Sequence, residues 1–478
     1  MILKELLQNF NYISCNENTN VEVCHITNNT KEVVKGSVYV CIEGFKTDGH
    51  NFIGEAVKKG AVALLVTKDI TRDDVAVIRV TDTRAAMASL ASLIYGQPSK
   101  KLKMIGVTGT NGKTTVTHII KTVLEMNGKK AGLIGTNTTV IGDKVIEAER
   151  TTPEAGTLHK WFAEMVDAGI EYCVMEVSSH SIDLKRVEGI EFDAAVFTNL
   201  THDHLDFHGT MENYMNSKAK LFDRCRFAVI NADDEYGRKI AEKCKSKVFT
   251  YSIDENSDFK AKDIEYHDKG VIYNVAAGGE EHKVKAMHPG KFSVYNSLAT
   301  YALCSVLGFE SEEIEKGIII AKGAKGRAEI VNVPAPFKVM IDYAHTPDGL
   351  YNILTTMRTA AHGRIITVFG APGDRDKTKR PEMGEVVGRL SDYAIITSDN
   401  PASEKAEDII ASVEEGMRKT PCKYECITDR AQAIEKALSI AGQGDLVLLA
   451  GKGHETYQII GNEKVPFSEE KIVKNYFM

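Results

Sequence analysis

The sequence that decides the fold is MIGVTGTNGKTT at residues 104–115. Its apolar start predicts a buried strand over Met104–Val107, and a helix is predicted to begin at Lys113 after a glycine-rich turn. The spacing G-x-x-G-x-x-G-K-T-T fits the phosphate-binding loop pattern G-x-x-x-x-G-K-[ST], which ends here at Gly112, Lys113 and Thr114. A strand that leads through such a loop into a helix is typical of an α/β fold.

The residue types in this loop suit the polyphosphate of a nucleotide. Phosphate oxygens require backbone N–H groups that approach closely, and Gly109 and Gly112 leave room for that approach. Lys113 supplies a cation for the β- and γ-phosphates, and the hydroxyl of Thr114 is a suitable Mg²⁺ ligand. The alternative is a glycine-rich turn that binds no ligand. It does not explain why the strand, the glycines, Lys113 and Thr114 all occur at the spacing of a phosphate-binding loop. The residues expected at the nucleotide are Gly106, Val107, Thr108, Gly109, Thr110, Asn111, Gly112, Lys113, Thr114 and Thr115.

Length and composition describe an ordinary globular protein. The 478 residues correspond to about three domains of roughly 150 residues each. Hydrophobic residues make up 43% and charged residues 26%, so the chain can bury a core. The net charge of −7 argues against a general binder of nucleic acid or of anionic membranes. We expect small-molecule substrates as partners and a monomeric protein.

Several features predict a cytoplasmic location. No apolar run reaches the length that spans a membrane, so no membrane insertion is expected. The N-terminal segment MILKELLQNFNYIS predicts an amphipathic helix rather than a signal peptide. The nine cysteines are scattered and complete no zinc pattern. We therefore expect free thiols in a reducing cytosol.

Three domains are predicted along the chain, at residues 1–99, 100–329 and 330–478. The first is a compact α/β unit that ends in a linker at Gln97–Lys100, where Pro98 disfavours a preceding helix. Its predicted elements are strands at Ser37–Ile42, Val62–Val66 and Val75–Val80 and a helix at Phe52–Lys59.

The second domain carries the phosphate-binding loop and has apolar strands with polar carboxyl ends. One such strand ends at Glu176 before Ser178–His180, and another covers 194–200 before the polar run 201–208. This pattern is typical of a parallel sheet with its site along that edge. Residues 245–285 alternate more and predict a mainly antiparallel excursion. Further predicted elements are a helix from Lys113 to Met126, a strand at Lys130–Ile134 and a helix at Glu154–Ala168.

The third domain alternates strands and helices, which predicts a doubly wound, Rossmann-like fold. Its predicted strands are 338–342, 364–369, 393–397 and 445–450, and its predicted helices are 347–359, 380–389, 405–418 and 430–440. The loop 373–380 is dense in charge and has two interpretations. It is either a solvated loop with internal ion pairs, or Arg375 and Arg380 hold a carboxylate or phosphate by bidentate hydrogen bonds.

Two residues of the second domain are candidates for metal chemistry. Glu176 ends an apolar strand and suits Mg²⁺ coordination, directly or through water, although a buried Glu could instead cap a helix. A single histidine such as His204 is often a core residue. Acidic and imidazole groups gather around it in Asp203–His208, which indicates a polar or metal partner.

Several motifs together resemble the Mur ligases. Thr108–Thr115 is similar to the phosphate-binding loop of that family. Met175–His180 and Thr198–Gly209 resemble the MurE type, the branch that makes UDP-N-acetylmuramoyl-tripeptide. The same holds for Asp342–Pro347, Gly373–Met383 and Gly451–Glu455, so the resemblance covers all three predicted domains. It implies an N-terminal substrate domain, a central mononucleotide-binding domain and a C-terminal amino-acid-binding domain.

The resemblance implies an ATP-dependent amide ligase of peptidoglycan synthesis, and hence a role in cell-wall biogenesis, cell shape and cell division. The D-Glu carboxylate of UDP-N-acetylmuramoyl-L-alanyl-D-glutamate attacks the γ-phosphate of ATP and forms an acyl phosphate. The amine of an incoming diamino acid then displaces phosphate. Since two anions meet in the first step, Mg²⁺ and Lys113 are expected to screen their repulsion.

The resemblance also implies the catalytic and metal-binding residues. The catalytic residues are Lys113, Glu176, His204 and Lys218. Thr114 and Glu176 are expected to serve one Mg²⁺, and His204 a second. Lys218 matches the family's lysine that carries a CO₂-derived carbamate, which converts a cation into an anion beside the metal. Lys220 is the neighbouring alternative, but the spacing from Tyr214 favours Lys218.

The remaining implied contacts fall into three sets. The family positions that hold the adenine, phosphates and ribose of ATP correspond in this sequence to Asn296, Arg327 and Asp342. The UDP-muramoyl dipeptide is matched by Thr30, Thr151, Thr152, Ser178 and Arg186. The amino-acid pocket is matched by Arg375, Asp399, Asn400, Ala402, Gly451 and Glu455.

The sequence departs from the family pattern in two places. The turn Thr27–Lys31 keeps a hydroxyl at Thr30, but it lacks the Asp and Arg of the frequent T-x-D-S-R pattern. Ala402 stands where members that add meso-diaminopimelate usually carry Arg, whereas lysine-adding members can have Ala there. Gly453-His454-Glu455 nevertheless resembles the diaminopimelate type. L-Lysine and meso-diaminopimelate therefore both remain candidates for the added amino acid.

Two other function classes remain. A folylpolyglutamate-type ligase shares the phosphate-binding loop and the carbamylated lysine, but the separate N-terminal domain and the Ser178–His180 cluster speak against it. A catalytically silent binding or regulatory paralogue would explain the changes at Asn29, Lys31 and Ala402. The intact Lys113, Glu176, His204 and Lys218 argue against that alternative.

Overall fold

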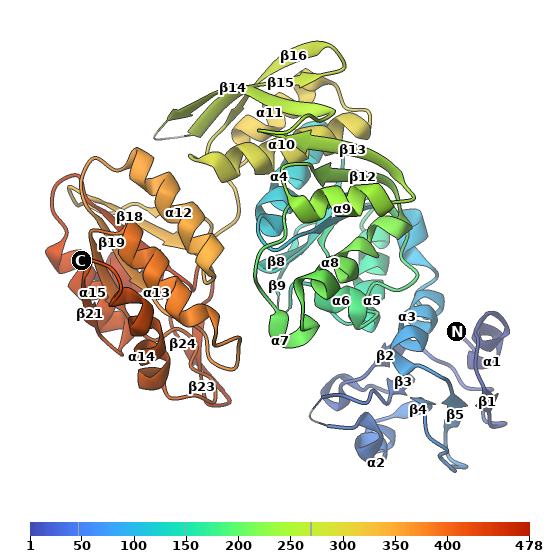
Figure 1. The fold of residues 1–478 in the computed structure, drawn as a ribbon. Helices are drawn as coiled ribbons and strands as arrows, with labels where there is room; N and C mark the ends of the chain where they lie inside the picture. The colour runs from blue at the N-terminus through green and yellow to red at the C-terminus, as the bar shows by residue number, and fades with distance from the viewer. Residues whose placement is uncertain (46, 149, 268–269) are drawn as a thin grey trace.

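The structure is a computed structural model, and it describes residues 1–45, 47–148, 150–267 and 270–478. Figure 1 shows three bodies, with the N-terminal one in blue, the central one in cyan to yellow and the C-terminal one in orange to red. Their sheets have five, eleven and six strands respectively, and a separate two-stranded hairpin lies near the C-terminus. Helices accompany each of the three sheets, as predicted for an α/β protein.

The N-terminal sheet has the order β1-β5-β4-β3-β2, and its strands are parallel except for β1. Its elements are β1 (Ser14–Cys15), β2 (His25–Thr27), β3 (Ser37–Val40), α2 (Ile53–Lys58), β4 (Ala61–Val66), β5 (Ala76–Arg79) and α3 (Thr83–Ile94). The predicted strands and helix are confirmed with slightly different ends. The predicted N-terminal amphipathic helix is only the short α1 (Leu3–Leu6) and a following 3₁₀ turn (Leu7–Asn9), in which the exposed Gln8 and Asn9 interrupt the apolar face.

The central sheet places the phosphate-binding strand between two parallel neighbours. Strand β6 (Lys103–Thr108) pairs with β10 (Tyr172–Glu176) on one side and β11 (Phe192–Phe197) on the other. Ile105 and Val107 of β6 enter one core, and Met104 enters the core on the opposite face. Both faces of the sheet are therefore covered, which explains why the buried residues Met104–Val107 of β6 carry no polar side chain.

Helices pack on both faces of this central sheet (Figure 1). One core includes α4 (Lys113–Met126), α10 (Lys291–Val306) and α11 (Ser311–Ile320). The other includes α5 (Ala155–Asp167), α6 (Ser179–Asp183), α8 (Met211–Ala219) and α9 (Glu235–Lys243). Further elements are β7 (Ala131–Ile134), β8 (Thr138–Ile141), β9 (Lys144–Glu147), α7 (Leu205–His208) and β12 (Cys225–Asn231).

The predicted antiparallel excursion is confirmed, apart from residues 268 and 269, which lie outside the described part of the chain. Strand β13 (Lys247–Ser252) still runs parallel to β12. Strands β14 (Phe259–His267), β15 (Gly270–Ala277) and β16 (Glu280–Ala286) then form an antiparallel meander. The meander extends the central sheet at one edge, away from the parallel strands around β6.

The C-terminal sheet has the order β17-β18-β22-β19-β20-β21, parallel except for β17. The predicted elements are observed as β18 (Lys338–Asp342), α12 (Pro347–Ala360), β19 (Ile365–Phe369), α13 (Lys379–Leu390), β20 (Tyr393–Ile396), α14 (Ala406–Met417), α15 (Arg430–Ile440) and β22 (Leu446–Ala450). The elements that the sequence pattern missed are β17 (Glu329–Val331), β21 (Lys423–Cys426), β23 (Tyr457–Ile460), β24 (Glu463–Pro466) and α16 (Glu469–Tyr476). The missed strands β21, β23 and β24 contain no fully buried residue, so they lack the apolar run that predicts a strand.

Candidate active site

The loop between β6 and α4 requires glycine at two positions. Gly109 has φ +148°, and a Cβ there would lie 1.9 Å from Thr198 Oγ1. Gly112 has φ +86°, and a Cβ there would lie 2.7 Å from Asn296 Oδ1. The backbone of the loop therefore lies directly against its neighbours, as a phosphate cradle at a helix N-terminus requires.

Lys113 lies at the start of α4 and folds back over the loop. Its Nζ donates hydrogen bonds to Gly109 O at 2.9 Å and to Thr110 O at 2.8 Å. Burial lowers the pKa of Lys113, and the nearby Glu176 carboxylate opposes that shift. The ammonium group thus lies inside the cradle where a phosphate oxygen binds in loops of this kind.

Glu176 ends β10 beside the loop, and its side chain is fully buried. Its carboxylate accepts hydrogen bonds from Thr136 N at 2.8 Å and Thr136 Oγ1 at 2.9 Å, and Thr136 Oγ1 lies 3.1 Å from Thr151 Oγ1. Glu176 caps no helix in this arrangement, so the helix-cap alternative is wrong. Sequence reasoning missed Thr136, although it belongs to the Thr-rich stretch after β7.

Lys218 reaches the same loop from α8. It is buried, and its Nζ donates to Gly109 O at 2.8 Å and lies 4.6 Å from the centroid of the Tyr214 ring. The Tyr214 hydroxyl lies 3.2 Å from Thr110 Oγ1. Burial lowers the pKa of Lys218 well below its usual value, and the charge of Lys113 adds to this effect. Lys220, by contrast, is an exposed residue that pairs with Asp183.

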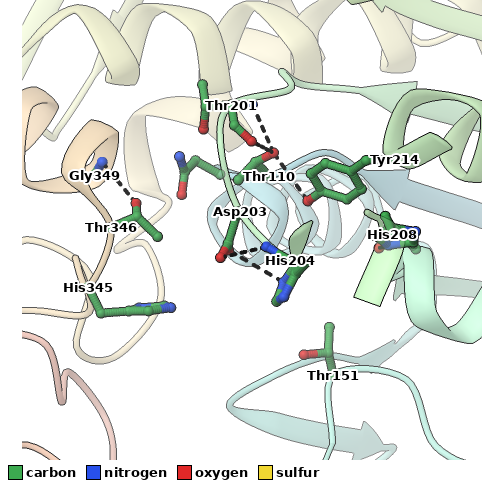
Figure 2. Close-up of polar contacts among 12 residues, drawn as sticks. Thr110, Thr151, Thr201, Asp203, His204, His208, Tyr214, His345, Thr346 and Gly349 are labelled. Carbon is green, nitrogen blue, oxygen red and sulfur yellow. Dashed lines mark hydrogen bonds and ion pairs between the residues drawn. The ribbon is translucent and has the colours of Figure 1, made fainter. Parts of the chain in front are cut away.

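His204 precedes α7 and is held by its neighbour Asp203, as Figure 2 shows. Its backbone N donates to Asp203 Oδ1 at 3.0 Å, and its Nε2 lies 3.4 Å from Asp203 Oδ2. Burial lowers the pKa of His204 to about 3, against the opposing effect of Asp203. The imidazole is therefore neutral at neutral pH, which is the form that binds a metal.

A cavity of about 330 Å³ lies between the central and C-terminal bodies. Asn111 and Gly112 of the loop line it together with the three predicted ATP contacts Asn296, Arg327 and Asp342. Arg327 lies 4.5 Å from the centroid of the Tyr343 ring and 3.4 Å from Thr114 Oγ1. Burial raises the pKa of Asp342, whose carboxylate accepts hydrogen bonds from Ala328 N and Ala344 N at 2.7 Å each. The structure thus brings the predicted nucleotide residues together from both bodies.

The residues predicted for the UDP-muramoyl dipeptide form two groups. Thr152 Oγ1 donates to Glu176 O at 2.9 Å and accepts from Ser178 N at 3.1 Å, and Arg186 Nη1 donates to Thr152 O at 3.0 Å. Thr30 lines a separate cavity of about 540 Å³, where the N-terminal body meets Thr157 and Trp161 of α5. The first group lies beside Glu176. The cavity lies where the N-terminal and central bodies meet, so a long molecule bound there can contact both of them.

Four of the predicted amino-acid contacts lie at the carboxyl ends of β20 and β22. Asn400 Nδ2 donates to Glu455 Oε2 at 2.9 Å, and Asp399 is buried with no partner for its Oδ2 among the described residues. Gly451 has φ +118°, and a Cβ there would lie 2.5 Å from that Asp399 oxygen. Lys452 Nζ donates to both Asn400 Oδ1 at 2.9 Å and Glu455 Oε2 at 2.7 Å, and sequence reasoning missed this buried residue.

The structure separates the two arginines of the charged loop. Arg380 is buried and pairs at 2.8 Å with Glu404, which lies outside the loop 373–380. Its guanidinium is therefore engaged within the protein, which fits neither a solvated loop with internal ion pairs nor an Arg380 that is free to hold a substrate anion. Arg375 is exposed, and its charge lowers the pKa of His180 in the central body, in addition to the larger effect of burial. Ala402 has φ +52°, and its backbone N donates to Ile459 O at 3.0 Å.

Contacts between the central and C-terminal bodies were not predicted. Asn111 Nδ2 donates to Asp348 Oδ2 at 2.7 Å, and His202 Nε2 lies 3.1 Å from Asp376 Oδ2. Within the central body, Asn137 Nδ2 also donates to the distant Lys325 O at 2.7 Å. These pairs are more than 170 residues apart in sequence, so no local pattern could have indicated them.

Comparison with known proteins places the chain in a family. The model described as "Mur ligase family, catalytic domain" matches residues 22–95, "Mur ligase middle domain" matches 107–304 and "Mur ligase, glutamate ligase domain" matches 326–453. The UDP-N-acetylmuramoyl-L-alanyl-D-glutamate–2,6-diaminopimelate ligase of Clostridium perfringens (strain 13 / Type A) is 47% identical over 99% of this chain and 99% of its own. The chain belongs to the Mur ligase family.

Solved structures agree with this assignment. A structure of a UDP-N-acetylmuramoyl-L-alanyl-D-glutamate–2,6-diaminopimelate ligase superposes with a TM-score of 0.70 at 28% identity, covering 100% of this chain and 98% of its own. A Mycobacterium tuberculosis folylpolyglutamate synthase complexed with ADP and AMPPCP has a TM-score of 0.64 at 17% identity, covering 76% of this chain and 91% of its own. The second likeness shows a shared fold alone.

Lys113→Ala is expected to weaken binding of the ATP analogue AMPPCP roughly ten- to hundred-fold, because the loop loses a charged hydrogen-bond donor. The measurement is isothermal titration calorimetry. Lys121→Ala is the matched control, since Lys121 lies on the same helix and pairs with the exposed Glu125. Equal affinity for Lys113→Ala and wild type would contradict the assigned role.

Proposed function

We propose that this chain is the ligase that adds 2,6-diaminopimelate to the D-Glu of UDP-N-acetylmuramoyl-L-alanyl-D-glutamate, at the expense of ATP. The observation that carries the proposal is the 47% identity, across the full length of both chains, to a ligase named for that reaction. The geometry supports it, because Lys113 and Lys218 meet at one carbonyl oxygen beside the cavity lined by Asn296 and Asp342. A folylpolyglutamate-type activity and a silent paralogue have no comparable support.

The reaction needs an activated carboxylate. The D-Glu carboxylate attacks the γ-phosphorus of ATP, the bond to the β-phosphate oxygen breaks, and ADP leaves. The amine of diaminopimelate then attacks the resulting acyl phosphate and loses a proton, and inorganic phosphate leaves as the amide forms. Lys113 is placed to neutralise phosphate charge in the first step, since its ammonium lies within the loop.

The residues present fit Mg²⁺. The hydroxyl of Thr114 and the buried carboxylate of Glu176 are oxygen donors of the kind that Mg²⁺ sites use with phosphate oxygens. The neutral imidazole of His204 would add a nitrogen donor. Thr114 and Glu176 would hold one ion and His204 a second. Bound there, the ions would neutralise the charge that develops on the phosphate oxygens.

Lys218 suits carbamylation by CO₂. Only a neutral amine attacks CO₂, and burial of Lys218 beside Lys113 lowers its pKa well below the usual value. Two buried lysines that donate to the same oxygen also repel each other. Converting one of them to an anionic carbamate would remove that repulsion and provide oxygen atoms for a metal.

We assign the UDP-muramoyl dipeptide to the N-terminal domain, residues 1–99, and to the edge of the central domain, residues 100–329. Thr30 would contact the nucleotide part, with Thr151, Thr152, Ser178 and Arg186 along the peptide part. Asn29 stands where the family pattern has Asp, and its Oδ1 still accepts a hydrogen bond from Lys31 N at 3.0 Å. The turn therefore keeps its cap without the acidic residue.

The amino acid would bind to the C-terminal domain, residues 330–478. Asp399 and Glu455 are acidic groups for an ammonium, with Asn400 and Gly451 completing the pocket. Ala402 offers no cation for the distal carboxylate. Arg375 is exposed and forms no ion pair among the described residues, so it would supply that cation.

The other properties that we propose follow from the same assignment. The enzyme would act as a monomer in the cytoplasm, where UDP-linked precursors and ATP are available. No helix in the described part of the chain is both long and apolar enough to cross a membrane.

The proposed function is tested by a ligation assay that offers 2,6-diaminopimelate, L-lysine and L-ornithine with ATP and UDP-N-acetylmuramoyl-L-alanyl-D-glutamate. Product mass identifies the amino acid that is added. We expect the tripeptide with diaminopimelate, at a kcat/KM at least about tenfold above that for L-lysine, because a charged hydrogen bond contributes roughly 1.5 kcal/mol or more. Phosphate release without any of these products would refute the assignment.

Ala402→Arg is expected to raise the ratio of kcat/KM for diaminopimelate to that for L-lysine roughly tenfold, because it adds a second cation for the distal carboxylate. Ala402→Met is the matched control. It places a long uncharged side chain at the same φ of +52° and so separates charge from backbone strain. An unchanged ratio in the Arg variant would show that position 402 selects neither substrate.

Lys218→Ala is expected to lower kcat by a factor of about a thousand or more, since both the carbamate and its metal contacts are lost. A short-chain carboxylate such as formate should restore part of the activity. Lys220→Ala, which removes only an exposed ion pair with Asp183, should behave as wild type. Full activity of Lys218→Ala would rule out the carbamate role.

A further inference from the structure

Lys379 is a buried cation at the border between the central and C-terminal domains. It is the first residue of α13, and its side chain is 3% exposed. Its Nζ lies 3.4 Å from Oδ1 of Asp203, whose side chain is 11% exposed. Since burying a charge is unfavourable unless it is paired, this contact between two domains stabilises both groups only while the domains are docked.

Asp203 in turn holds His204. One carboxylate oxygen accepts the His204 backbone N–H at 3.0 Å, and the other lies 3.4 Å from His204 Nε2. His204 has φ +55°, a left-handed conformation that a residue with a Cβ adopts at a cost. Figure 2 shows both contacts, with His345 of the C-terminal domain extending toward them. The imidazole orientation thus depends on where the Asp203 carboxylate is held.

Neighbouring cations on the same segment do not share this contact. Lys377 is 69% exposed and pairs with Glu404 at 2.8 Å, and Arg380 pairs with the same carboxylate at 2.8 Å. Both pairs stay within the C-terminal domain. Of these three cations only Lys379 contacts the central domain in the described part of the chain.

We propose that Lys379 is a positioning residue, which reaches across from the docked C-terminal domain to fix Asp203 and, through it, the His204 imidazole. The inference rests on the proposed function, in which His204 serves a metal ion. Docking supplies a residue that orients the metal ligand as well as the second substrate.

Docking does not depend on Lys379 alone. Asn111 Nδ2 donates to Asp348 Oδ2 at 2.7 Å, and His202 pairs with Asp376 at 3.1 Å. Neither contact involves the Lys379 side chain, so we expect both to remain when Lys379 is replaced. The effect of such a replacement on His204 can therefore be separated from loss of domain contact.

The test measures Mn²⁺ binding by electron paramagnetic resonance in the full chain with AMPPCP and UDP-muramoyl dipeptide. Lys379→Met is expected to weaken one of two Mn²⁺ sites roughly ten- to hundred-fold, the range typical for loss of a group that orients a metal ligand. Lys379→Arg keeps the charge and should recover part of the affinity. Lys377→Met is the matched control and should bind both ions as wild type does.

The activity readout is the Mg²⁺ concentration that gives half-maximal ligation, which should rise in Lys379→Met by a similar factor. Wild-type Mn²⁺ affinity in Lys379→Met, or a single Mn²⁺ site in the wild type, would overturn the proposal. If Lys379→Met fails to fold in a thermal melt, Asp203→Asn provides the second variant and should weaken the same site. Mn²⁺ binding requires no turnover, so this result is independent of whether the ligation assay succeeds.

Discussion

Two buried lysine side chains donate to one backbone oxygen of the phosphate-binding loop, Gly109 O. Lys113 comes from the helix that follows the loop, and Lys218 comes from α8, more than a hundred residues later. Two ammonium groups this close in a buried site repel each other and depress each other's affinity for protons. Burial of both side chains therefore favours an anion beside them, and in a phosphate-binding loop a nucleotide phosphate is such an anion.

The sheets bring the other groups to this pair of cations. β6, β10 and β11 are parallel neighbours, so the phosphate-binding loop, Glu176 and the segment that carries His204 leave the same edge. In the C-terminal sheet β22 lies between β18 and β19. The loop that follows β22 lies beside the loop that follows β20, where Lys452 donates to Asn400. Each sheet by itself therefore offers half of a site, and contacts such as Asn111 to Asp348 join the halves.

Local patterns predicted the parts that depend on neighbours in sequence. The strand, turn and helix around Lys113 follow from apolar spacing and two glycines at which a Cβ would meet neighbouring atoms. Asn296 and Asp342 required the family resemblance, because their nearness to the loop arises only when distant segments fold together. The pairing of Lys379 with Asp203 had no signal at all. In sequence, Lys379 is one of several charges in a polar loop, and burial alone distinguishes it from Lys377.

A buried cation, Arg430, holds the starts of the loops that carry Asp399 and Gly451. Arg430 donates to Glu469 Oε1 at 2.9 Å through Nε and to Ala450 O at 2.8 Å through Nη2, and its Nη1 reaches Ser398 O at 3.4 Å. It thereby ties together the ends of β20 and β22, from which the pocket loops start. None of these contacts involves Ala402, so the framework does not depend on the side chain at that position. Under the proposed function, a substitution at position 402 would change amino-acid selection without disturbing this framework.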